Sequence, residues 1–71
     1  MDLLEAQEVV TEMLDTAVQD VMKLKARLGK LRREYEEDAW ELTAAQIKLV
    51  EARLERRVKE ANALGVMASS F

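Results

Sequence analysis

Four acidic side chains near the middle of the chain have a spacing that could serve chemistry. Glu34, Glu37, Asp38 and Glu41 stand at positions i, i+3, i+4 and i+7, which share one face of a helix. Carboxylates gathered in this way are suitable ligands for a hard cation. Di-iron bundles pair such acids with histidine, and this chain has no histidine. We therefore interpret the four acids as a solvated or salt-bridged face and expect no metal site.

Other patterns that carry catalysis are also missing from the sequence. It has no glycine-rich phosphate loop and no serine in a nucleophile-elbow setting. Because cysteine is absent as well, disulfides and the usual zinc or iron–sulfur frameworks are excluded. We expect no enzyme activity and no cofactor.

A cluster of bases is the one feature that could contact nucleic-acid phosphates. This basic cluster consists of Lys23, Lys25, Arg27, Lys30, Arg32 and Arg33. On a helix its members spread around the axis instead of forming one docking stripe, and acidic segments flank it on both sides. The net charge of −3 adds no support for nucleic acid. A dimeric four-helix bundle that binds nucleic acid through the basic cluster is therefore only the alternative function.

The elements that position these residues are predicted by a heptad repeat. One frame holds apolar side chains at positions a and d from residue 3 to residue 49, with breaks at Gln7 and Asp38. This spacing is typical of helices that pack lengthwise against other helices. The members of this seam are Leu3, Val10, Leu14, Ala17, Val21, Leu24, Leu28, Leu31, Tyr35, Leu42, Ala45 and Leu49.

Gly29 is the only interior residue that could interrupt the helical pattern. A glycine commonly follows the last turn of a helix, and bases before it with acids after it suit the dipoles of two helices. However, residues 29–33 offer no Ser, Thr, Asp or Asn to cap a second helix, and the heptad frame passes through Gly29 unbroken. Asp38 and Glu41 have the spacing of a capping box, which we interpret as two acids on the surface of a helix.

From these signals we predict an all-α, oligomeric fold, an antiparallel helical hairpin. The hairpin or coiled-coil domain would cover residues 1–65, with helices at about 3–28 and 31–64, a turn near 29–30, and a flexible tail at 66–71. Such a hairpin places Asp2 and Glu5 beside Arg53, Arg56 and Arg57. The alternative is a single long helix in an antiparallel coiled coil. A parallel dimer is disfavoured, because its flanking charges would mostly repel.

A second apolar stripe begins at Trp40, on the side opposite the seam. A helix with two apolar faces belongs inside an assembly, and tryptophan is a common interface anchor. An alternative interpretation is that the seam changes phase near Asp38, which would leave Leu42 and Leu49 peripheral. We expect partner contacts at Trp40, Ile47, Leu54, Val58, Leu42 and Leu49.

The expected function is protein–protein interaction through helix packing. With no disulfide or metal to stabilise so small a domain, association with other chains is the natural source of stability. A scaffold, an adaptor and a small chaperone subunit all fit, as a homo-oligomer or in a complex with another protein. No apolar run is long enough to span a membrane and the N-terminus lacks a basic signal region, so we expect a cytoplasmic protein without a membrane partner.

Overall fold

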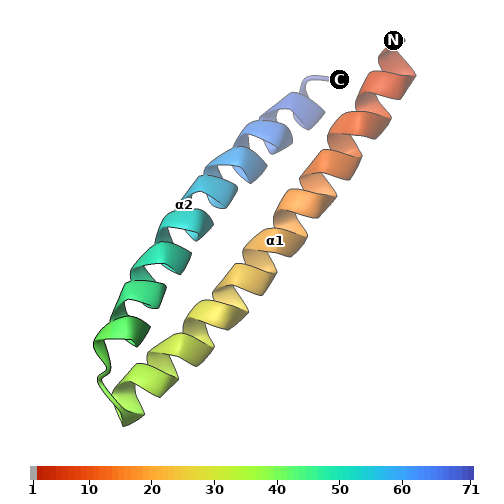
Figure 1. Ribbon diagram of the computed structural model, residues 1–71. Helices are drawn as coiled ribbons and strands as arrows, with labels where there is room; N and C mark the ends of the chain where they lie inside the picture. Colours follow the sequence, from red (N-terminus) through yellow and green to blue (C-terminus); the bar gives the residue numbers. More distant parts are fainter. Residues whose placement is uncertain (1) are drawn as a thin grey trace.

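The computed structural model describes residues 2–71 and consists of two α-helices. Helix α1 spans Leu3–Glu37 and helix α2 spans Glu41–Ser69. They run antiparallel, side by side, with the two termini at the same end of the molecule (Figure 1). The longest dimension is 53 Å, close to the length of about 52 Å that a 35-residue helix has at 1.5 Å per residue. The predicted all-α hairpin is therefore present; residue 1 of the predicted domain lies outside the described residues.

The predicted position of the turn is wrong. Gly29 lies inside α1, and the chain reverses at residues 38–40 instead of 29–30. A Cβ atom at Gly29 would meet nothing within 4 Å, and the backbone has no positive φ there. Glycine in a helix interior costs only about 1 kcal/mol relative to alanine. The buried side chains of Leu28 and Leu31 on either side offset this cost.

The turn uses backbone hydrogen bonds and no glycine or proline. The Asp38 N–H, at the end of α1, donates to the Glu34 carbonyl at 2.9 Å, and the Trp40 N–H donates to the Asp38 carbonyl at 2.7 Å. Trp40 is the N-cap residue of α2 and makes no side-chain capping bond. The interpretation of Asp38 and Glu41 as two acids on the surface of one helix is wrong, because Asp38 is the C-cap residue of α1 and Glu41 is the first residue of α2. The capping-box spacing lies within two residues of the true boundary, although Asp38 is not the N-cap residue. Trp40 instead accepts a hydrogen bond from the Ala44 N–H through its own carbonyl.

The core is a narrow strip between the two helices. Leu28, Leu31 and Val50 form its buried centre, with Leu24, Ile47 and Leu54 packed around them. Val10 and Ala17 extend the strip toward the termini.

An ion pair between Asp20 and Arg57 joins the two helices and shows how they align. Because the turn lies at residues 38–40, the basic part of α2 lies beside the middle of α1. The predicted placement of Asp2 and Glu5 beside Arg53, Arg56 and Arg57 is therefore wrong. These three bases line a groove with Asp20 and Lys23 of α1 instead.

Both ends of the hairpin are helical close to the termini. Asp2 caps α1, since its Oδ1 atom accepts a hydrogen bond from the Glu5 N–H at 2.7 Å. At the other terminus α2 continues through Gly65 to Ser69. The predicted flexible tail at 66–71 is thus mostly the last turn of α2, where Ala68 is half-buried.

Candidate functional site

The hairpin leaves more large apolar side chains on its surface than it buries. Its buried apolar residues are Val10, Ala17, Leu28, Leu31 and Val50. The exposed large apolar residues are Leu3, Leu4, Val9, Met13, Val18, Met22, Tyr35, Trp40, Leu42, Leu49, Val66, Met67 and Phe71. Isolated surface apolar residues are ordinary, so what matters is which of them lie together.

Half of the residues predicted to bind a partner face α1 instead. Ile47 and Leu54 pack against the buried core, and Val58 is half-buried in a shallow groove that Val18 and Met22 of α1 also line. In the hairpin these three side chains are therefore only partly exposed. The reason is a change of phase: the apolar stripe that starts after the turn, and not the earlier heptad seam, continues the core.

The other half of the predicted set remains exposed. Leu42 is 51% exposed and Leu49 is 62% exposed, while neighbouring Val50 is 3% exposed. Ala45 and Ala52 are exposed as well, and together the four residues recur at the three-and-four spacing of one helix face. We call Leu42, Ala45, Leu49 and Ala52 the outward row. Trp40, also exposed, stands at the turn just before the row begins.

Charged residues flank the outward row on both sides. Helical periodicity places Glu41 and Lys48 along one flank, and Gln46 and Arg53 along the other. Glu41, Lys48 and Arg53 are exposed and Gln46 is half-buried. An apolar strip with a charged rim is the usual anatomy of a helix-packing surface.

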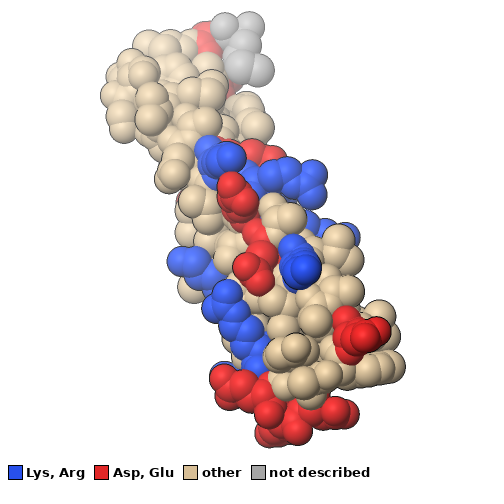
Figure 2. Space-filling model, turned by 90° about the vertical axis from the view of Figure 1, so that its left-hand side faces the viewer, with Lys and Arg blue, Asp and Glu red and all other residues tan. Residues whose placement is uncertain are grey.

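The basic cluster lies around the middle of the hairpin. All six of its members are exposed on α1. The antiparallel alignment brings Lys23 of α1 close to bases of α2. These residues share a shallow groove, which is lined by Lys23, Arg53, Arg56 and Arg57 together with the acids Asp20 and Glu60. Viewed from the α2 side, the blue side chains gather over the middle, mixed with red ones, while the turn end is red and the opposite end is largely uncharged (Figure 2).

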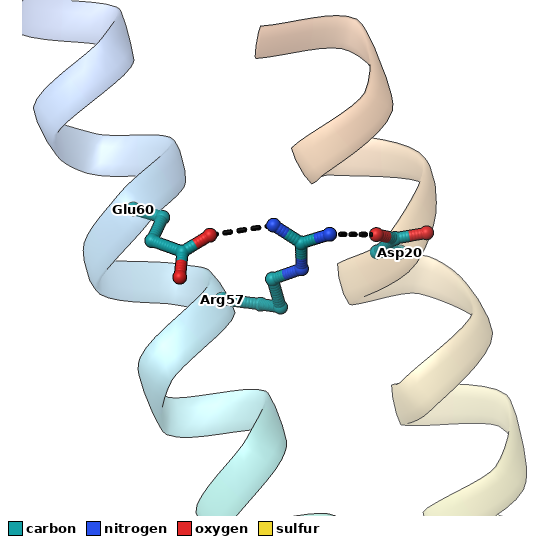
Figure 3. A network of polar contacts seen from close by, with 3 residues as sticks. All are labelled: Asp20, Arg57 and Glu60. Atoms are coloured by element: carbon teal, nitrogen blue, oxygen red, sulfur yellow. Dashed lines mark hydrogen bonds and ion pairs between the residues drawn. The ribbon is translucent and has the colours of Figure 1, made fainter. Parts of the chain in front are cut away.

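Arg57 makes two hydrogen bonds within this groove. Its guanidinium donates hydrogen bonds to Glu60 and to Asp20, each at 2.5 Å, so that one cation bridges the two helices (Figure 3). The hydrogen bond to Glu60, followed by the one to Asp20, raises the pKa of Arg57 above its ordinary value. Arg57 therefore stays charged in this position and acts as a clamp between the helices, not as a proton donor.

The end of the hairpin that holds the termini also exposes apolar side chains that sequence reasoning missed. They include Val66 and Met67, in the predicted flexible tail, and Val9 and Met13 of α1, and exposed acids of α1 lie at the same end. From residue 61 to residue 71 the chain carries no charge. Only the absence of charge in this stretch could have indicated the region in advance.

The acidic residues do not form the continuous face expected of a cation site. Helix α1 ends at Glu37, and Glu41 opens α2 after the turn. Within residues 2–71, no group of three or more His, Cys, Asp or Glu side chains is placed to hold a metal ion. Neither helix of this described part has a stretch long and apolar enough to cross a bilayer.

No known protein family, curated protein or solved structure matches this chain. The functional argument therefore depends on the surface of the hairpin itself. Two features of that surface are candidate binding sites. One is the outward row of α2, and the other is the basic cluster together with the bases of α2 that line the shallow groove.

Proposed function

We propose that this protein is a non-enzymatic interaction module that packs antiparallel onto partner helices through the outward row of α2. The observation that carries the proposal is the exposure of Leu42 and Leu49 at heptad spacing on a helix whose other face is already filled. A helix with apolar side chains on two faces is typical of the interior of a bundle.

The energetics support the same conclusion. Fully burying a leucine side chain contributes about 1.5–3 kcal/mol, and the outward row offers two leucines that are more than half exposed. The hairpin core contains five buried apolar residues, one of them an alanine. A partner helix on the outward row would therefore add apolar burial comparable to a large part of the existing core.

The proposal covers a scaffold subunit, an adaptor and a small chaperone. In each case the surface recognises an amphipathic helix, apolar contact supplies the affinity, and the flanking charges select direction and register. The cytoplasmic location expected from the sequence remains a prediction.

A photo-crosslinking side chain at position 49 tests the proposal in native cells. We expect crosslinks from position 49 to a protein, either another copy of this chain or a different one. The same group at Met22 is a matched control, because Met22 is exposed to 65% but lies on α1 away from the outward row. A position 49 that crosslinks no more than position 22 would refute the proposed surface.

Nucleic-acid binding is the second candidate, favoured by one observation. The hairpin gathers Lys23 with Arg53, Arg56 and Arg57 around one groove, so the basic surface is larger than the basic cluster alone. Asp20 and Glu60 in the same groove reduce its positive charge. Binding of this kind should fall steeply with salt and be lost when Lys25, Arg32 and Arg33 are replaced by Glu. A protein–protein interaction module would keep its partner both at raised salt and after these three replacements.

A further inference from the structure

We propose that the partner of the outward row is a second copy of this chain, related by a two-fold axis that passes beside Ala45. In this dimer the α2 helices of two hairpins cross antiparallel, and the two turn ends overlap. The inference rests on the proposed function and names the partner of that surface.

The outward row is complementary to itself when two copies are arranged in this way. If the two-fold axis passes beside Ala45, a residue a given number of positions before Ala45 in one copy faces the residue about as many positions after Ala45 in the other. The numbers of two facing residues therefore add up to about 90. Leu42 of one copy then faces Leu49 of the other, and the reciprocal contact repeats it. Ala45 meets its own copy at the centre, where two small side chains allow the helices to approach closely. A two-fold axis requires such self-complementarity.

The flanking charges agree with the same register. In a two-fold antiparallel pair, residues on the same flank of the two helices face each other. Glu41 therefore lies opposite Lys48 of the second copy, and this attractive pair occurs twice. Beyond the apolar layers, Arg53 approaches the acidic turn of the other hairpin, where residues 34–41 include five acids and no base. Because Gln46 on the other flank is uncharged, no like charges face each other within the overlap of the two α2 helices.

A parallel arrangement of two copies brings like charges together. A parallel pair of α2 helices in register sets Lys48 against Arg53 and Glu55 against Glu60. Antiparallel overlap at the turn ends instead places Glu41 opposite Lys48.

The size of this contact sets the expected strength of the dimer. In this register the two α2 helices overlap from residue 41 to about residue 49, a length of about 13 Å at 1.5 Å per residue. Contacts of one helix pair over this length fall at the small end of specific interfaces, below about 1,200 Å². We therefore expect a weak dimer that dissociates on dilution.

The register of the dimer is tested by reversing the charge of Glu41 or Lys48 and measuring the dissociation constant by analytical ultracentrifugation. Replacing Glu41 with Lys, or Lys48 with Glu, turns both symmetric pairs repulsive and should weaken the dimer about tenfold at low salt. The double variant Glu41→Lys/Lys48→Glu should recover the original affinity. An equimolar mixture of the two single variants should form a heterodimer, because each unfavourable charge then meets its opposite.

Glu5→Lys is the matched control for Glu41→Lys. Glu5 stands in the first turn of α1 as Glu41 stands in the first turn of α2, so both substitutions lose a similar interaction with a helix dipole. Because Glu5 is far from the outward row, its replacement should leave the dimer unchanged. Circular dichroism checks that every variant stays helical.

Several results would overturn the inference without touching the proposed function. A purified chain that remains monomeric at several hundred micromolar, or single variants whose mixture forms no heterodimer, would refute self-pairing in this register. If position 49 still crosslinks to a different protein in cells, the proposed function stands and the partner is that protein. If position 49 crosslinks to nothing in cells, the proposed function fails as well.

Discussion

Replacing Val50 with Ala tests which face of α2 packs against α1. The Val50 side chain is 3% exposed and sits in the buried centre with Leu28 and Leu31. The substitution removes the equivalent of two methylene groups, worth about 0.8 kcal/mol each, and leaves a cavity that adds to the loss. We expect the free energy of unfolding to fall by about 2 kcal/mol. For a domain of this size, this corresponds to a decrease in Tm of about 12 °C.

Leu49→Ala is the internal control, because it removes more apolar volume one residue away. Leu49 is 62% exposed, so its replacement should change the stability of the single hairpin by no more than about 0.5 kcal/mol. Both variants are compared by thermal and urea unfolding, followed by far-ultraviolet circular dichroism at chain concentrations where the hairpin is monomeric. Equal losses, or a larger loss for Leu49→Ala, would refute the phase of α2 described here and restore the heptad seam as the core.

Three further substitutions test separate parts of the hairpin. Gly29→Ala should stabilise the chain by about 0.5–1 kcal/mol, measured as a higher Tm, because Gly29 is helical with open space around its Cβ position; a chain that turned at Gly29 would be destabilised. Asp2→Ala should cost about 1 kcal/mol in urea unfolding, because Asp2 accepts the Glu5 N–H, and Asp2→Asn should keep most of the stability. Asp20→Asn should lower Tm slightly at low salt and hardly at all in concentrated salt, since the Arg57 ion pair is partly exposed; an unchanged salt dependence would contradict a role for this pair.

The sequence predicts the class of fold well because helical periodicity is a local property. The seam from Leu3 to Leu31 is regular, and its buried members in α1 are those the heptad frame selects. The position of the turn is harder to predict, because residues 38–40 contain no glycine or proline, and the turn preference of Asp38 and its capping-box spacing also fit an acid on the surface of a helix. Gly29 is the clearer turn candidate in the sequence, but the packing of Leu28 and Leu31 outweighs the small helical cost of one glycine.

The inner and outer faces of α2 could not be told apart from periodicity alone. Both rows have helical spacing, and the earlier frame continues through Leu42 and Leu49. The break of that frame at Asp38 was the one signal that the phase changes. After the turn, the direction in which α2 leaves the loop decides the outcome, and it brings Val50 inward and Leu49 outward. That direction depends on three-dimensional contacts and not on local sequence.

Folding and association should be coupled in this protein, because the two faces belong to one helix. A partner at a hundredfold excess over its dissociation constant stabilises a folded chain by about 2.7 kcal/mol, which is comparable to the loss expected for Val50→Ala. The Tm of the chain should therefore rise with its own concentration, and Val50→Ala should regain most of its lost stability when it is concentrated enough to dimerise. Leu49→Asp should abolish that rise while leaving the Tm at high dilution almost unchanged. A Tm that is independent of concentration in the unmodified chain would mean that the outward row does not bind a second copy.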